Sequence, residues 1–148
     1  MPGVVSDFTE HKDYVKTRKL QLDIISQYKG DFGKHIKSNE LIKTNMVWES
    51  IPIQLAKENK KFFFGQIKQG SRSADFELSI QWLVDCGLAY KVNRVNEPHI
   101  PLKAYIDFKA YKLFLIDVGL LGAMSELDAR TILEKDDMFI EFKGALAE

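Results

Sequence analysis

The segment from Ser73 to Val95 most constrains the fold, because an amphipathic helix is followed at once by a strand. In "ADFELSIQWLVDC" the apolar residues recur at i, i+4, i+7 and i+8, which is the pattern of a helix with one buried face. These residues are Phe76, Ile80, Leu83 and Val84. We expect Ser73 to cap this helix and Gly87 to end it.

The next residues, "LAYKVNRV", alternate between apolar and polar side chains, which predicts a strand with one face in water. Leu88, Tyr90 and Val92 are expected on the buried side, and Lys91 and Asn93 on the exposed side. After the loop "NEPHIP", residues 102–116 favour one or two further strands, and the next residue, an aspartate, is expected to cap a short helix.

The N-terminal half is predicted to be mainly helical. Leucine, isoleucine and tyrosine recur at every fourth position between Lys12 and Lys29, which indicates a helix that Gly30 would end. The polar "GDFGKHIKSNE" that follows is interpreted as a linker with a boundary near residue 36. Because Pro52 disrupts a continuous helix, we expect two short helices that meet near Ser50 and Ile51.

A brief strand is predicted from Phe62 to Ile67, because "KFFFGQI" is aromatic and β-branched. The resulting order of helix, helix, strand, longer helix, strand, loop and strand is the layout of a winged helix, a form of helix-turn-helix domain. The expected fold class is therefore α+β. We expect a linker helix over residues 1–36, the winged helix over 37–100 and a further segment over 101–148.

Composition excludes several classes of protein. The 21 basic and 21 acidic side chains cancel, so no global field draws the chain to nucleic acid or to an anionic membrane. Cys86 is the only cysteine and no leader segment precedes the first helix, so a cytoplasmic protein without disulfides is expected. The longest apolar run, residues 113–121, contains Asp117 and Gly119 and is too short for a bilayer span, so no membrane partner is expected.

Three long stretches carry a resemblance to a known family. They are "VWESIPIQLAKENKKFFFGQIKQGSRSADFELSIQWLVDCGLAYKV", "PLKAYIDFKAYKLFLIDVGLLGAM" and "FIEFKGALAE", and "MPGVVSDF" and "YKGDFGKHI" add to them near the start. Together they resemble the C-terminal half of prokaryotic AAA-type ATPases. In that family an ATPase module precedes a winged-helix region and a C-terminal domain of unknown function with a restriction-endonuclease-like look.

The resemblance implies that this chain is a fragment of such an ATPase, with a truncated C-terminal domain from residue 101. ATP and Mg²⁺ are expected for the parent protein and no cofactor or metal for this chain, in which the phosphate-binding pattern G-x-x-x-x-G-K-[ST] does not occur. Glu148 is similar to the first acid of a nuclease-type metal site, but its partner carboxylates would lie beyond residue 148. No catalytic residue is therefore expected. The expected partners are the ATPase module and the C-terminal domain of the same parent chain.

Six residues are candidates for contact with double-stranded DNA. Four lie where the N-terminal end of a recognition helix would meet the major groove, and two lie on the strand that would form a basic wing. The first group is Lys68, Ser71, Arg72 and Ser73, and the second is Lys91 and Arg94. The helix itself carries only acidic charges, so packing and protein contact are the stronger interpretation of it.

Other residue types favour structural roles. The tryptophans and phenylalanines could stack on single-stranded bases, but their spacing favours core packing. His11, His35 and His99 lack the spacing of a metal site, and Cys86 is expected to be buried and inert. Two functions remain: a non-catalytic connector between protein domains, which the neutral charge favours, and a DNA-binding winged helix.

Overall fold

The computed structural model describes residues 1–57 and 61–127, together with Gly144. Over these residues the protein is α+β, with five α-helices and one two-stranded antiparallel sheet. Glu148 and nearly all of the stretch "FIEFKGALAE" fall outside the described residues. None of the described helices is long and apolar enough to cross a bilayer.

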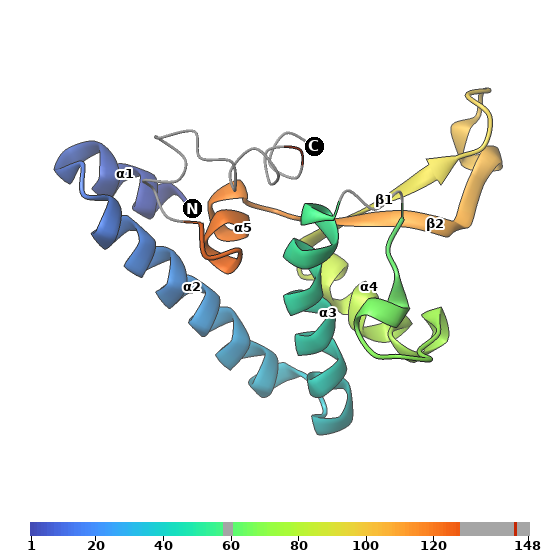
Figure 1. Ribbon diagram of the computed structural model, residues 1–148, viewed down its shortest axis with the longest axis horizontal. Coiled ribbons are helices and arrows are strands. Elements are labelled where there is room, and N and C mark those ends of the chain that lie inside the picture. Colours follow the sequence, from blue (N-terminus) through green and yellow to red (C-terminus); the bar gives the residue numbers. More distant parts are fainter. Residues whose placement is uncertain (58–60, 128–143, 145–148) are drawn as a thin grey trace.

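The first two helices, α1 (Pro2–His11) and α2 (Tyr14–His35), are joined at Lys12, whose φ of 54° is in the left-handed region. Asp13 caps α2 by accepting a hydrogen bond from the backbone N–H of Lys16 at 3.0 Å. In Figure 1 α2 is a long diagonal helix with α1 beside one end, α5 along its flank and the α2–α3 junction at its other end. This helix therefore connects the region of α1 and α5 to the start of α3.

The predicted linker after Gly30 is wrong, because α2 continues through Gly30 and Gly33 to His35 and α3 (Ser38–Ala56) begins three residues later. Phe32 explains the difference. Its side chain is only 1% exposed, and its ring packs edge-on against Trp48 and Trp82. These tertiary contacts outweigh the weak helix propensity of the two glycines.

Helix α3 is a single helix, so the prediction of two short helices was also wrong. Pro52 lies inside it and cannot donate a backbone hydrogen bond to the preceding turn. The helix nevertheless continues, because Trp48, Ile51 and Leu55 on one face are all at most 5% exposed and belong to the same core. Burial of this face offsets the missing hydrogen bond.

The predicted strand from Phe62 to Ile67 does not form. Only the N–H of Phe62 donates to the sheet, to the carbonyl of Tyr111 at 2.7 Å, and Phe64–Gln66 form a 3-10 turn. The rings of Phe62 and Phe64 pack against each other and against Tyr111, and Phe64 also stacks on Phe76. These aromatic residues therefore fill the core under the sheet and do not extend the sheet.

The helix predicted from Ser73 to Cys86 is confirmed, although its first part is a 3-10 turn at Ser73–Asp75 and the α-helix α4 spans Glu77–Asp85. Ser73 does not cap it. The carboxylate of Asp75 instead accepts a hydrogen bond from the N–H of Arg72 at 2.7 Å. Gly87, with a φ of 68°, follows the helix end as predicted, and Ser79, Ile80 and Leu83 are buried.

The two predicted strand regions form β1 (Ala89–Val95) and β2 (Ile106–Leu115), which pair as a hairpin, but the expected faces are reversed. Ala89, opposite Leu115, is 2% exposed, whereas Tyr90 and Val92 are 57% and 53% exposed. The reason lies in β2, because the alternating residues Leu113 and Leu115 are buried and set which face meets the helices. The expected boundary between residues 100 and 101 falls between these paired strands.

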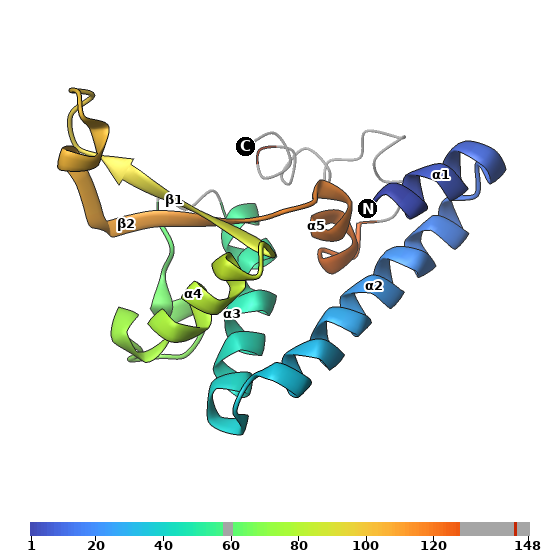
Figure 2. The same ribbon diagram turned by 180° about the vertical axis from the view of Figure 1, so that it is seen from behind.

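The predicted capping of the last helix by Asp117 is confirmed. Its Oδ1 accepts from the N–H groups of Gly119 and Leu120, at 2.7 and 3.2 Å, at the start of α5 (Val118–Met124). Leu120 and Ala123 of α5 pack on Ile25 of α2 in a small second core. The larger core is formed mainly by side chains of α2, α3, α4 and the hairpin. Figure 2 shows these elements from behind.

Candidate functional site

The turn before α4 brings three of the candidate DNA-contact residues together. The N–H of Ser71 donates to the carbonyl of Lys68 at 3.1 Å, and the Ser71 hydroxyl also donates to that carbonyl. The N–H of Arg72 is used by Asp75, so the turn is held by its own hydrogen bonds. The Lys68 and Arg72 side chains are exposed and form no ion pair within residues 1–57 and 61–127.

Ser73 and Lys91, from the two predicted groups, meet on Tyr111. The Ser73 hydroxyl is hydrogen bonded to the Tyr111 phenol, and the Lys91 Nζ lies over the Tyr111 ring at 4.3 Å from its centroid. Tyr111 is only 6% exposed. Burial raises its pKa to about 12; the Ser73 hydrogen bond opposes this shift and the charge of Glu77 adds to it. Both candidate residues therefore serve an internal contact.

Arg94 is also engaged within the chain. Its guanidinium donates to Asp107 Oδ2 at 2.5 Å across the hairpin. The pKa of Asp107 is lowered, first by the hydrogen bond from the Lys109 N–H and then by that from Arg94. Arg94 is near the end of β1 and Asp107 near the start of β2, beyond the register shift and towards the tip of the hairpin. The charge of Arg94 is compensated, and Arg94 does not join the turn before α4.

The exposed surface of α4 is acidic and apolar. From residue 73 to residue 87 the chain has three acidic side chains, Asp75, Glu77 and Asp85, and no lysine or arginine. Leu78, near the start of α4, is 72% exposed. A helix with this surface repels phosphate groups, because nothing along it compensates their charge.

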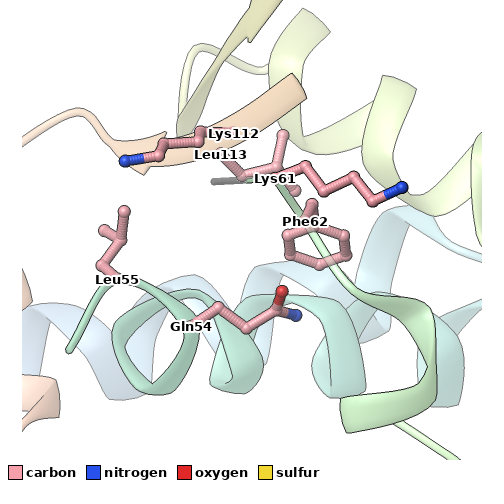
Figure 3. A pocket seen from close by; sticks show the side chains of 6 residues that line it. All are labelled: Gln54, Leu55, Lys61, Phe62, Lys112 and Leu113. Carbon is pink, nitrogen blue, oxygen red and sulfur yellow. The ribbon is translucent and has the colours of Figure 1, made fainter. Parts of the chain in front are cut away.

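A shallow depression between α3 and β2 does not form an anion site. It is lined by Gln54, Leu55, Lys61, Phe62, Lys112 and Leu113. Figure 3 shows the ammonium groups of Lys61 and Lys112 pointing to opposite sides of it. The Gln54 amide is already used, since its oxygen accepts from the Phe63 N–H at 2.7 Å and its nitrogen donates to Ser50.

Among the described residues, no group of three or more histidine, cysteine, aspartate or glutamate side chains could hold a metal. Cys86, expected to be buried, is exposed at the end of α4. Its pKa is nevertheless raised, first by partial burial of the sulfur and then by the neighbouring Asp85. The thiolate is disfavoured, so this thiol is a weaker nucleophile at neutral pH than an unperturbed cysteine.

The prediction that the aromatic residues pack in the core is confirmed for most of them. Trp48, Phe62 and Phe76 are at most 6% exposed, and Trp82 and Phe64 are partly buried against the same core. Phe63 differs, at 40% exposed, with the Lys61 Nζ 5.7 Å from its ring centroid. Among these six rings only that of Phe63 is exposed, and one ring is not a platform for successive bases.

Comparison with known proteins identifies the family. The model of a domain of unknown function, DUF8612, matches residues 1–131. The chain belongs to the DUF8612 family. No curated protein and no solved structure matches it. The matched segment contains every described element from α1 to α5, so the DUF8612 domain includes α1 and α2 as well as the α4 and hairpin region.

Two residues of this DUF8612 chain, Tyr111 and Asp107, were not predicted as part of the site. Tyr111 lies in the apolar stretch "FKAYKLFLI", where nothing local separates it from an ordinary strand residue. Asp107 could have been identified from the sequence, because it is one of only two acidic residues between Leu88 and Ile116. An acid on one strand of a basic hairpin indicates an ion pair across that hairpin.

The raised pKa of Tyr111 predicts a pH dependence of stability in the DUF8612 chain. In the unfolded chain a tyrosine ionises near pH 10, whereas in the folded protein Tyr111 ionises at about 12. The contribution of the neutral Tyr111 side chain to the free energy of unfolding is therefore complete below pH 10 and is lost as the pH rises towards 12. Denaturant unfolding between pH 9 and about 11.5 should show a steeper fall for the wild type than for Tyr111→Phe. If the stability of the wild type and of Tyr111→Phe fell in parallel with pH, the raised pKa would not belong to Tyr111.

Proposed function

We propose that this chain is a non-catalytic winged-helix connector in an AAA-type ATPase, where it mediates interdomain or protein–protein contact. The order of the elements supports a winged-helix topology. Helix α3 is followed by the Phe62 contact with β2, then by α4 and then by the β1–β2 hairpin. In such a topology the short turns Phe64–Gln66 and Ser73–Asp75 would stand in for the middle helix. The resemblance to AAA-type ATPases supports the proposal that the parent protein is such an ATPase.

The surface of α4 is the observation that carries the proposal. In a DNA-reading winged helix this helix enters the major groove and needs cationic or hydrogen-bonding side chains. Here the helix has Glu77 and Asp85 as its only charged side chains, and the exposed Leu78 adds apolar surface. Acidic and apolar groups together suit a protein partner better than a phosphate backbone.

The packing of α2 supports transmission of movement between domains. Near its C-terminal end Phe32 is held between Trp48 of α3 and Trp82 of α4. Nearer its N-terminal end Ile25 packs on Leu120 of α5. Because close-packed side chains transmit displacement, a movement of α2 would carry the α3–α4 unit with it.

The partners in this proposal are the ATPase module and the C-terminal domain of the same parent chain, in the cytoplasm. ATP and Mg²⁺ would bind to the ATPase module. This chain would contribute the mechanical link and no catalytic group.

DNA binding is the alternative function, and the exposed side chains of Lys68 and Arg72 favour it. They lie together in the turn before α4, on the side from which a recognition helix approaches bases. Ser71, Ser73, Lys91 and Arg94 add less, because each has an internal contact.

Fluorescence anisotropy with labelled double- and single-stranded DNA distinguishes the connector function from DNA binding. We expect no binding by the wild type at about 50 mM salt, where phosphate contacts are strongest, and none at about 200 mM. Salt-sensitive binding that is lost in Arg72→Ala/Arg94→Ala would overturn the connector proposal. The variant Lys19→Ala/Lys37→Ala removes the same charge from exposed positions on α2 and at the start of α3, and controls for net charge.

A further inference from the structure

The hairpin has a second face that carries exposed apolar side chains, although Phe114 on this face is partly buried against the core. In the register of β1 and β2, Tyr90 lies opposite Phe114 and Val92 opposite Lys112. Ile116 continues the same face, because side chains alternate along a strand. We call these residues the outer face. Tyr90, Val92 and Ile116 are 57%, 53% and 46% exposed.

The outer face is unusual for a two-stranded sheet. Antiparallel sheets normally bury one face and present polar side chains on the other. Here the inner face is buried through Ala89, Leu113 and Leu115, yet the outer face is also mainly apolar. Phe108, in the irregular part of β2, adds a ring that is 75% exposed. Contiguous exposed apolar surface of this kind marks an interaction site.

The hairpin around this face is basic. Residues 88–116 contain five basic and two acidic side chains, a net charge of +3. Lys103 and Lys109 are exposed on the distal part of the hairpin. The occupant of the outer face should therefore combine apolar and acidic groups.

The exposed surface of α4 has this composition. Residues 73–87 carry a net charge of −3, and Leu78 is 72% exposed next to Glu77. Gln81 follows Leu78 by three residues and Asp85 follows Gln81 by four, so the three lie on the same side of the helix. The two surfaces of one chain are complementary in charge, and each has exposed apolar side chains.

Within one chain these two surfaces cannot meet. Only Cys86 and Gly87 separate α4 from Leu88, whose N–H donates to the carbonyl of Leu83 at 2.9 Å. Leu83 and Ala89 lie in the same buried core, so α4 is held on the inner side of its own hairpin. The α4 of one chain therefore cannot cover the outer face of the same chain's hairpin.

We propose that the occupant is a second copy of this chain, whose α4 docks on the outer face of the hairpin. Leu78 of one copy would pack on Tyr90 and Val92 of the next, with Glu77 and Asp85 near the basic hairpin. Because two different surfaces meet, the contact is head-to-tail and builds rings or chains of copies. The proposal depends on the connector function only in treating α4 as a protein contact.

Charge reversal on either surface provides the test, with sedimentation velocity over a concentration series of the full chain. The wild type should self-associate more strongly at low than at high salt. Lys103→Glu/Lys109→Glu makes the hairpin acidic, and Glu77→Lys/Asp85→Lys makes α4 basic. Each variant should associate at least about tenfold more weakly than the wild type, because like charges then face each other.

An equimolar mixture of the two variants is the decisive sample. Each contact in the mixture again joins opposite charges, so association should return to near the wild-type level. The matched control Lys19→Glu/Lys37→Glu should associate like the wild type, and circular dichroism should show that all variants are folded. A wild type that stays monomeric, or a mixture that does not recover, would overturn the proposal. Such a result without DNA binding would leave the connector function intact.

Discussion

Phe32→Ala is expected to lower the free energy of unfolding by about 3–5 kcal/mol, the usual cost of emptying a buried phenylalanine site. The side chain is 1% exposed, and its ring centroid lies 5.8 Å from that of Trp48 and 5.2 Å from that of Trp82. The loss would be a large part of the total stability of a domain of this size. Urea denaturation followed by circular dichroism measures it.

Gly30→Ala is the matched control for Phe32→Ala in the same stretch of α2. A Cβ added at Gly30 meets nothing within 4 Å, and the residue lies inside the helix. Alanine should therefore raise the free energy of unfolding by about 0.5–1 kcal/mol. If residues 30–35 were instead a linker, both substitutions would be nearly neutral. That result would contradict the long α2 and the contact of Phe32 with the core.

The stretch from Gly30 to His35 shows why local pattern failed in the N-terminal half. Two glycines and an aspartate within four residues weaken any local preference for helix. The stabilising contacts of Phe32 come from α3 and α4, which are 16 and 50 residues further along the chain at Trp48 and Trp82. A sequence periodicity that extends over a few helical turns cannot reveal contacts between residues so far apart in the chain.

The C-terminal half was easier to predict because its signals are local. The helix from Ser73, the glycine after its end, the two strands and the Asp117 cap all follow from residues within a few positions of one another. What the alternation of β1 could not reveal was which face is buried. That depends on Leu113 and Leu115 of the partner strand, since both faces of the hairpin carry apolar residues.

The candidate site was predicted as a set of residue types but not as an arrangement. Lys68, Ser71 and Arg72 do lie together, because they are close in sequence and one turn holds them. The roles of Ser73, Lys91 and Arg94 depend on Tyr111 and Asp107 of β2. Residue types in β1 and the α4 turn carry no information about which β2 side chain lies opposite them, so these internal contacts could not be foreseen.

Trp48→Ala is expected to cost about 3–5 kcal/mol of unfolding free energy, as is usual for a buried aromatic residue. Trp48 is 0% exposed and packs edge-on against Phe32 and Tyr28 of α2, at centroid distances of 5.8 and 6.4 Å. It therefore joins α3 to the long helix. Because Trp48 and Phe32 touch, the double variant should lose less stability than the two single losses added together, with a coupling of about 0.5–3 kcal/mol.

Trp48→Phe separates ring packing from the polar group of the indole. The Trp48 Nε1 is buried and has no hydrogen-bond partner, so its removal leaves no donor or acceptor unpaired. Phenylalanine keeps an aromatic ring at the contact with Phe32 and leaves a smaller cavity, so its cost should be clearly below that of alanine. Urea denaturation followed by circular dichroism compares the three proteins. Equal losses for phenylalanine and alanine would mean that the indole N–H has a partner, and that α2 is held to α3 by more than ring packing.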